Sequence, residues 1–219
     1  MLSRFCSLLL FVCLQTSFFY GYAQLNAPVI LDADTGNEVD DLYALVRALT
    51  EPKWQIPGLN ATQWQVSHWA VEKSMEESYR LNQVLLSYLD SDHSIQSLRG
   101  AESRLFDWGN KSHPSSASNF IIEQALQQET GKINIIALGA LTNVASAILD
   151  NPEIVSKVRL YWLGSSYDFS TGALKNIDFN SVMDIQAVDV LLNSAVEMHI
   201  MPSNVALAME FDWQETYER

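Results

Sequence analysis

Cysteine is nearly absent from this sequence of 219 residues, which has only Cys6 and Cys13, both close to the N-terminus. If the first residues are removed on export, as their pattern below suggests, the mature chain has no cysteine at all. It then has neither a disulfide framework nor a thiol nucleophile, and its stability depends on an apolar core.

The N-terminus has the pattern of a secretory leader. Arg4 precedes an apolar stretch over 5–14, and Gly21-Tyr22-Ala23 ends in a small residue, as cleavage sites do. We therefore expect residues 1–23 to be a signal peptide and the mature chain, 24–219, to be exported to the periplasm or secreted. An uncleaved anchor is the alternative, although the apolar stretch is short for a spanning helix.

Basic residues are also scarce, with 13 Lys and Arg against 26 Asp and Glu and a formal net charge of −13. Removal of the leader takes away Arg4 and no acid, which leaves 12 − 26 = −14. Nucleic acids and anionic membranes are bound by clustered Lys and Arg. We therefore expect neither as a partner of the mature chain, and a small molecule instead.

Repeats, charge blocks and long Gly/Ser linkers are absent as well, which favours a single domain over 24–219. The hydrophobic share of 48% is enough for an ordinary core. One polar stretch, 107–118, is rich in Ser, Asn and Gly and predicts a surface loop.

Strand-like apolar runs alternate with helical periodicities along the mature chain. This alternation predicts the α/β class, with an open, mostly parallel, Rossmann-like sheet and helices on both faces. We expect strands at 28–33, 55–59, 133–138, 158–163 and 196–201, and helices at 39–49, 67–89, 118–128, 141–149 and 185–194.

Aspartates gather where the first predicted strand ends. Asp32 and Asp34 end the strand, the chain turns through Gly36, and Asp40 and Asp41 open the next helix. In open α/β sheets ligands bind outside the carboxyl ends of the strands. Carboxylates so close together repel one another unless a cation lies among them, and a hard divalent cation with oxygen ligands is the usual solution. The cluster indicates a metal-dependent enzyme.

Four segments together resemble the inosine–uridine-preferring nucleoside hydrolases. Asp34-Thr35-Gly36 followed by Asp40-Asp41 is similar to their N-terminal aspartate motif, and 137–145 to their glycine-leucine-threonine-asparagine turn. The strand and glycine over 160–164 and the sugar-binding segment that begins with Asp178-Phe179-Asn180 and continues to Asp184 and Ala187 follow in the family's order. The resemblance covers most of the mature chain and implies a nucleoside-hydrolase-like fold.

The resemblance implies a hydrolase that cleaves the N-glycosidic bond of ribonucleosides or related N-ribosides. Calcium would be held by the carboxylates of Asp34 and Asp41 and by the backbone carbonyl of Leu138. Asp40 would take a proton from a calcium-bound water and contact a sugar hydroxyl, which suits a metal that stabilises hydroxide near neutral pH. That water would attack the anomeric carbon through an oxocarbenium-like transition state. Homo-oligomers are implied too.

Three further residues are expected at the substrate. Asn180 matches a family residue that binds the sugar hydroxyls, and Asp178 stands where the family usually has glutamate. Asn60, in Gly58–Thr62, resembles another sugar-contacting asparagine.

The sequence departs from the family pattern in two places. Asn37-Glu38-Val39 lengthens the turn between Gly36 and Asp40. The sequence also stops at Arg219, whereas family members continue and there supply another calcium-ligating aspartate and a histidine that assists the leaving base. We therefore expect a truncated or fragmentary member, which makes a catalytically inactive sugar- or nucleoside-binding remnant the main alternative.

Other interpretations of these residues stay open. Asp40 or Asp41 could cap a helix, as could Thr142 and Asn143 after Gly139. Asp32 is expected to support the site from behind rather than to react.

A second enzymatic alternative is a haloacid-dehalogenase-like phosphohydrolase, because Asp32-Ala33-Asp34 follows an apolar strand. That chemistry expects a hydroxyl residue where Gly36 stands, a downstream lysine and magnesium, and no convincing lysine is found.

Overall fold

The computed structural model describes residues 27–90, 94–105, 111–209 and 214. The predicted signal peptide lies outside these residues, as do positions 107–110 of the predicted loop. The elements in chain order are β1 (Val29–Ala33), α2 (Asp40–Leu49), β2 (Gly58–Ala61), α3 (Ser74–Leu89), β3 (Gln96–Leu98), α4 (Ser116–Leu126), β4 (Ile133–Ala137), α5 (Thr142–Asp150), the 3-10 helix η1 (Pro152–Lys157), β5 (Val158–Leu163), β6 (Ser166–Asp168), β7 (Ala173–Lys175), α6 (Phe179–Met183), α7 (Ile185–Leu192), β8 (Glu197–Met201) and α8 (Ser203–Ala206). None of the helices in these ranges is both long and apolar enough to cross a membrane.

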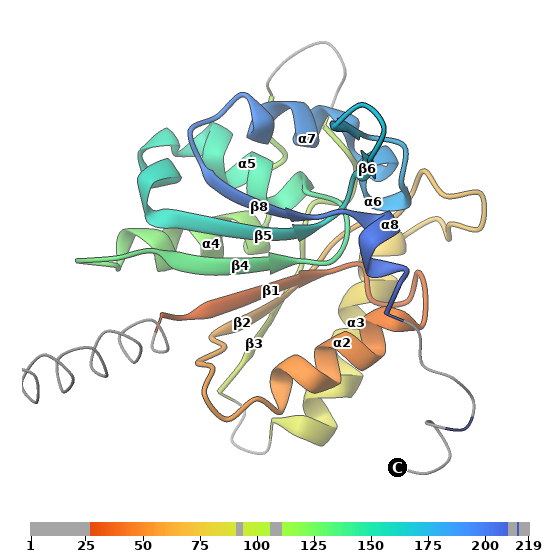
Figure 1. Ribbon diagram of the computed structural model, residues 1–219. Coiled ribbons are helices and arrows are strands. Elements are labelled where there is room, and N and C mark those ends of the chain that lie inside the picture. The colour runs from red at the N-terminus through yellow and green to blue at the C-terminus, as the bar shows by residue number, and fades with distance from the viewer. Residues whose placement is uncertain (1–26, 91–93, 106–110, 210–213, 215–219) are drawn as a thin grey trace, which may run out of the picture.

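Six parallel strands form the main sheet in the order β3-β2-β1-β4-β5-β8, which confirms the predicted fold class (Figure 1). From β1 the chain extends the sheet first toward β3 and then, starting with β4, toward β8. The strand order therefore reverses between β1 and β4. At such a switch point the connections leave in opposite directions and open a crevice outside the carboxyl ends of the two strands.

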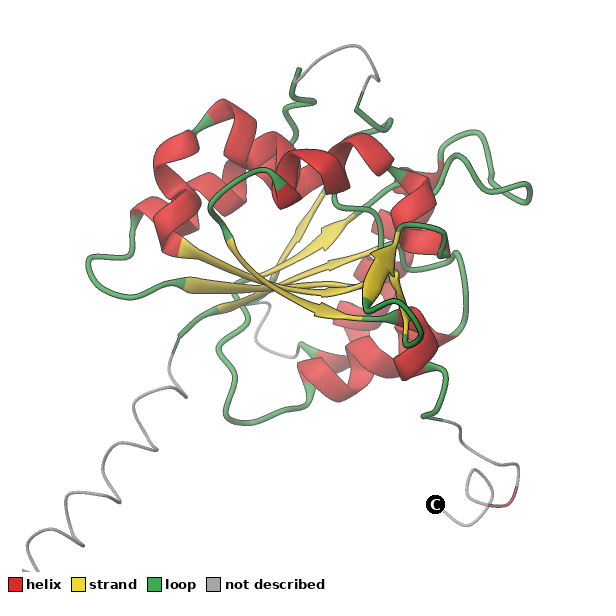
Figure 2. Ribbon diagram, turned by 45° about the horizontal axis from the view of Figure 1, so that its top comes forward, coloured by secondary structure: helices red, strands yellow, loops and turns green. Residues whose placement is uncertain are grey.

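The helices form a layer on each side of the sheet (Figure 2). On one side α4, α5 and α7 pack on a large apolar cluster that includes Ile30, Leu160 and Trp162. On the other side α2 and α3 pack on a smaller cluster that includes Leu31 and Leu45. Neighbouring residues of β1 thus enter opposite clusters, and all five β1 residues are buried. This explains why the strand is a continuous apolar run rather than an alternating one.

The outer strands are less covered on the side of α2 and α3. Leu31 is paired with Ile136, Ile136 with Tyr161, and Tyr161 with His199, so these residues point to the same side of the sheet. Tyr161 and Met201 remain exposed there, and the Tyr161 ring stacks on His199 at a centroid distance of 4.8 Å. Across the described ranges, helices on this side therefore cover β1 to β3 better than β5 and β8.

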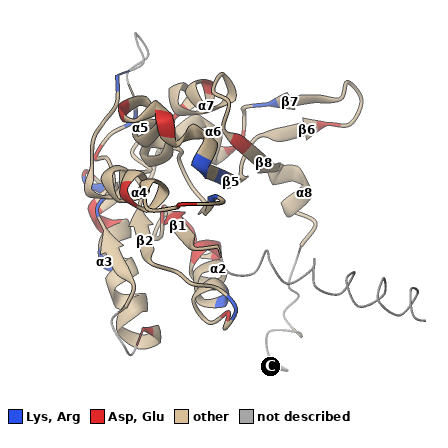
Figure 3. Ribbon diagram, turned by 90° about the vertical axis from the view of Figure 1, so that its left-hand side faces the viewer, with Lys and Arg blue, Asp and Glu red and all other residues tan. Residues whose placement is uncertain are grey.

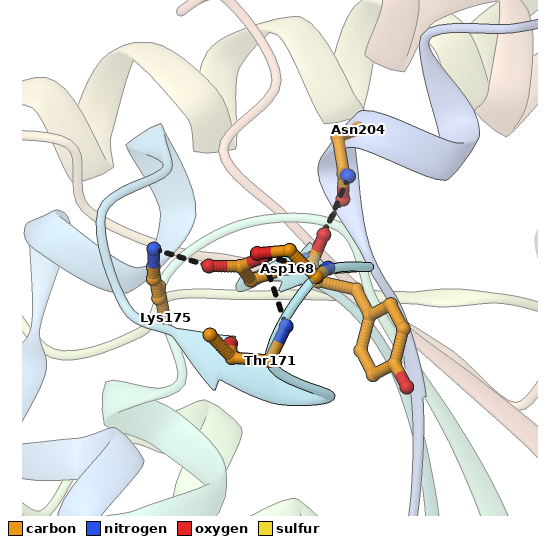
Figure 4. A network of polar contacts seen from close by, with 6 residues as sticks. Asp168, Thr171, Lys175 and Asn204 are labelled. Atoms are coloured by element: carbon orange, nitrogen blue, oxygen red, sulfur yellow. Dashed lines mark hydrogen bonds and ion pairs between the residues drawn. The ribbon is translucent and has the colours of Figure 1, made fainter.

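A hairpin of β6 and β7 projects beyond the carboxyl end of β5. Within it, the Asp168 carboxylate accepts a hydrogen bond from the Thr171 N–H at 3.3 Å and pairs with Lys175 at 2.7 Å (Figure 4). Asn204 of α8 accepts from the Tyr167 N–H and donates to the Tyr167 carbonyl, both at 2.9 Å. The hairpin is thus held both internally and against α8.

Several boundaries differ from the prediction. The helix expected over 67–89 begins at Ser74, and residues 67–73 form turns. The strand expected over 55–59 is Gly58–Ala61, because parallel pairing to Ile30–Ala33 sets its register. The elements β3, β6, β7, α6, η1 and α8 were not predicted; each is six residues or shorter, too short for a periodic pattern.

Glu197 on the edge strand β8 gives a test of acid stability. It accepts from Arg159 at 2.5 Å, Lys132 at 2.8 Å and His199 at 3.0 Å, and these contacts, Arg159 first, lower its pKa to about 2. Because the folded pKa is depressed, the stabilisation is present above the ordinary pKa of 4.5 and is lost as pH falls toward 2. Urea unfolding should therefore show Glu197→Gln less stable than wild type at pH 7, with a smaller gap at pH 3. Glu153→Gln is the control, and a gap that is constant with pH contradicts the prediction.

Candidate functional site

Asp34 and Asp41 are brought into contact at the switch point. Asp34 directly follows β1 and Asp41 lies in the first turn of α2, and only 1% and 6% of their surfaces are exposed. Burial raises the pKa of both carboxyl groups, and the charge and contact of Asp41 raise that of Asp34 further. Figure 3 shows acidic residues at the end of β1 and the start of α2. Two like charges in contact and out of water need a shared proton or a cation.

The turn after β1 is built to hold Asp34 in place. The Asn37 N–H donates to the Asp34 carbonyl at 3.0 Å, and Gly36 has a φ of 112°, a conformation that side chains disfavour. On the other side of Asp34, a Cβ at Gly139 would lie 2.5 Å from its Oδ1. A glycine after β4 is therefore required for the backbone of β4 to approach this carboxylate.

Leu138, the predicted carbonyl ligand, lies in the same turn after β4. Its N–H donates to the Asp32 carbonyl at 2.8 Å, which ties it to β1. Its own carbonyl accepts from the Asn180 side-chain amide at 2.6 Å, and this amide also donates to the Leu163 carbonyl at 2.9 Å. Asn180 thus connects the carboxyl ends of β4 and β5, and its predicted contact to sugar hydroxyls stays a prediction.

Asp40 is exposed, beside the buried pair. Its charge contributes to the raised pKa of both Asp34 and Asp41, which places it close to them. The N-cap of α2 is Val39, without a capping side chain, so the helix-cap interpretation of Asp40 and Asp41 is wrong. Both acids lie in the first turn, where the helix dipole still favours negative charge.

Asp32 and Asn60 lie side by side inside the sheet. The two residues are paired in the register of β1 and β2, and neither has any exposed surface. Burial raises the pKa of Asp32 to about 7, and the neighbouring amides of Asn143 and Asn60 offset part of this rise. The Asn143 amide donates to Asp32 at 2.9 Å and to the Ala61 carbonyl at 3.0 Å. Asp32 supports the site from behind, as expected, whereas the sugar contact predicted for Asn60 stays a prediction.

Asp178 begins α6 as its N-cap. Its carboxylate accepts from the Ser181 N–H at 3.3 Å and from the Ser181 hydroxyl. Both carboxylate oxygens are thus used within the helix. In this arrangement Asp178 orients α6, and with it Asn180, whereas its predicted contact to the substrate stays a prediction.

Thr142 and Asn143 do not cap α5, whose N-cap is Leu141 without a capping side chain. The Thr142 hydroxyl donates to Asp184 at 2.6 Å instead, while Asn143 reaches Asp32. Asp184 also accepts from the Leu105 N–H at 3.0 Å. These buried hydrogen bonds connect α5 to α7 and to β1, beside the site.

Nothing in the sequence indicated that Asn37 and Trp69 contact one another at the rim of the site. The Asn37 amide donates to the Asp34 carboxylate at 3.4 Å and accepts from the Trp69 indole N–H at 2.9 Å. Trp69 stacks on Phe179 at 5.6 Å, with ring planes 14° apart. The sequence contains six Trp and offers no periodic signal that distinguishes Trp69. Its neighbours become visible only in three dimensions.

Comparison with known proteins reveals relatives along most of the chain. The sequence model described as inosine-uridine preferring nucleoside hydrolase matches residues 29–219. Probable uridine nucleosidase 2 of Oryza sativa subsp. japonica is 25% identical over 209 residues, 87% of this chain and 60% of the relative. Non-specific ribonucleoside hydrolase RihC of Klebsiella pneumoniae is 26% identical over 188 residues, 80% of this chain and 60% of the relative. The chain therefore spans about 60% of the length of these curated relatives.

Solved structures share the fold. An inosine-guanosine nucleoside hydrolase has a TM-score of 0.67 at 23% identity and is matched over 87% of this chain and 65% of its own. A purine-preferring ribonucleoside hydrolase from Gardnerella vaginalis has a TM-score of 0.67 at 22% identity, with 88% and 66% covered. Because the family model matches far more than half of the sequence, the chain belongs to the inosine-uridine preferring nucleoside hydrolase family.

Proposed function

We propose that this protein hydrolyses the N-glycosidic bond of ribonucleosides or related N-ribosides, and that it does so with calcium. The observation that carries the proposal is the buried Asp34–Asp41 contact at the switch point of a chain in this family. Its relatives include proteins named as uridine nucleosidases and non-specific ribonucleoside hydrolases. The substrate is accordingly a small nucleoside.

The residues present fit a hard divalent cation. Asp34 and Asp41 offer carboxylate oxygens that are buried and in contact, and burial with like charge is unfavourable without a positive partner. The Leu138 carbonyl accepts one hydrogen bond and has a second lone pair for a further partner. No cluster of three or more His, Cys, Asp or Glu side chains suited to a metal occurs within the described ranges. We therefore propose the two acids and the carbonyl as the ligands from this part of the chain.

Different residues of the chain have different roles in the proposed reaction. Bound calcium would lower the pKa of a coordinated water and so supply hydroxide near neutral pH. Asp40, exposed beside the buried pair, is the base that accepts the proton and contacts a sugar hydroxyl. Asn180 would contact the sugar from the carboxyl end of β4, with Asp178 orienting its helix.

We further propose that residues 1–23 direct export to the periplasm or beyond and that the mature domain acts as a homo-oligomer. The leader pattern supports export, and the family resemblance supports assembly. N-terminal sequencing of the exported protein would show whether the chain begins at Gln24.

A binding protein without turnover is the second candidate. One observation favours it: within the described ranges, Asp34 and Asp41 belong to no cluster of three or more His, Cys, Asp or Glu side chains that could hold a metal. Calcium or nucleoside binding without release of free ribose from any nucleoside would select this function over hydrolysis.

Asp40→Asn tests the proposed base. Removal of the carboxylate should lower the rate of ribose release from inosine or uridine by about 10²–10⁴-fold, the usual contribution of general base catalysis. Reducing-sugar formation measures the rate, and circular dichroism confirms that the fold is intact. Glu38→Gln, an exposed acid in the same turn, is the matched control and should stay close to wild type. Equal rates for Asp40→Asn and wild type would exclude Asp40 as the base.

Asp41→Asn tests the proposed cation at the buried pair. Without calcium the substitution removes a carboxylate that is unfavourable first because it is buried and then because its charge lies beside those of Asp34 and Asp40, so the Tm in EDTA at pH 8 should rise above that of wild type. With millimolar calcium wild type should gain the larger increase in Tm, because ligand binding stabilises only the state that binds it. Differential scanning fluorimetry of both proteins measures the two values. The prediction fails if calcium raises the Tm of both proteins equally.

A further inference from the structure

Trp69 lies at the rim of the site and touches two of the elements that carry it. Its indole N–H donates to the Asn37 side-chain carbonyl at 2.9 Å, and its ring stacks on Phe179, the first residue of α6. Asn37 belongs to the turn that holds Asp34, and Phe179 precedes Asn180. One side chain therefore bridges the β1 turn and α6.

The direction of the Asn37 amide follows from this contact. An indole N–H can only donate, so it must face the carbonyl oxygen of Asn37, which leaves the NH₂ group on the other side. That group is 3.4 Å from the Asp34 Oδ2, a long contact that strengthens when Asp34 is ionised, as it must be to bind a cation. Trp69 thus decides that Asn37 presents a donor, not an acceptor, to the carboxylate.

We propose that Trp69 is a positioning residue for the acid pair: through Asn37 it fixes the Asp34 carboxylate in the orientation that holds a divalent cation. The proposal rests on the proposed function, because the cation is part of it. Asn37-Glu38-Val39 lengthens this turn, and a longer turn has more backbone freedom to lose. A bond from Trp69 to the turn restricts that freedom before the cation arrives. The segment 67–73 forms turns rather than the predicted helix, and this conformation carries Trp69 to Asn37.

Trp69→Phe separates the hydrogen bond from the stacking. Phenylalanine can keep the ring against Phe179 but cannot donate to Asn37, so the calcium dissociation constant from titration calorimetry should rise by about two- to tenfold, as for one lost hydrogen bond. Trp54→Phe is the matched control, since Trp54 is similarly exposed (37% against 43%) but precedes β2 at the opposite end of the strands. The control should keep the wild-type calcium affinity.

A double-mutant cycle distinguishes positioning from general loosening. Asn37→Ala should weaken calcium binding, and the Asn37→Ala/Trp69→Phe double variant should bind no more weakly than Asn37→Ala alone, because Trp69 acts through Asn37. If the two effects multiply, Trp69 does not act through Asn37 and the proposal is overturned.

A readout without calcium keeps the proposal testable if the proposed function fails. The backbone N–H of Asn37 is bonded to the Asp34 carbonyl at 3.0 Å, so its hydrogen exchange reports on the turn. Trp69→Phe should accelerate this exchange by about two- to tenfold in the calcium-free protein, whereas Trp54→Phe should not. Unchanged exchange in Trp69→Phe overturns the proposal. Absence of calcium binding to the wild type would instead refute the proposed cation, with the exchange result still deciding the role of Trp69.

Discussion

Two carboxyl groups in contact and nearly out of water are the constraint on which this structure depends. Asp34 and Asp41 reach one another because β1 is a central strand, the chain turns through Gly36, and α2 starts at Asp40. The β4 turn then closes the site from the side, where Gly139 leaves room for the Asp34 carboxylate. Two buried carboxylates in contact are unfavourable on their own and become favourable when a cation binds between them.

Buried hydrogen bonds behind Asp34 and Asp41 hold the two residues in a fixed position. Asp32 lies under the site and is bonded to Asn143, which also holds the Ala61 carbonyl of the neighbouring strand. Asp184, at the start of α7, accepts a hydrogen bond from Thr142 of α5 and so connects these two helices. Buried hydrogen bonds of this kind are costly to leave unmade, so they restrict the strands and helices to one relative position. A site built from the ends of β1 and β4 and the start of α2 needs that restriction.

Much of the fold could be predicted, because the central strands are apolar runs that alternate with helical periodicities, as in a parallel sheet covered by helices on both faces. The core strands and the class followed from 28–33, 133–138 and 158–163. Other features could not be predicted. The strand β3 has three residues and no periodic pattern, and residues 67–73 form turns before α3, where Trp69 makes a tertiary contact with Asn37. Where long-range contacts decide a boundary, local sequence carries no signal for it.

The functional site, like the fold, could be predicted only in part. Asp34, Asp40 and Asp41 are close in sequence, so a strand followed by a turn and a helix was enough to bring them together. Asn60 lies buried beside Asp32, and this contact follows from the register of β1 and β2, which the spacing of residues in the sequence does not reveal. Thr142 and Asn143 were open to a capping role that their distant partners, Asp184 and Asp32, exclude.

Anomalous diffraction from crystals soaked with terbium, a heavy substitute for calcium, locates a bound cation directly. If Asp34 and Asp41 share a cation, the strongest peak should lie about 2.3–2.6 Å from oxygens of both carboxylates. Ordered carboxylates in direct contact, with the strongest peak elsewhere in the molecule, would show that the pair shares a proton rather than a metal and would contradict the proposed function.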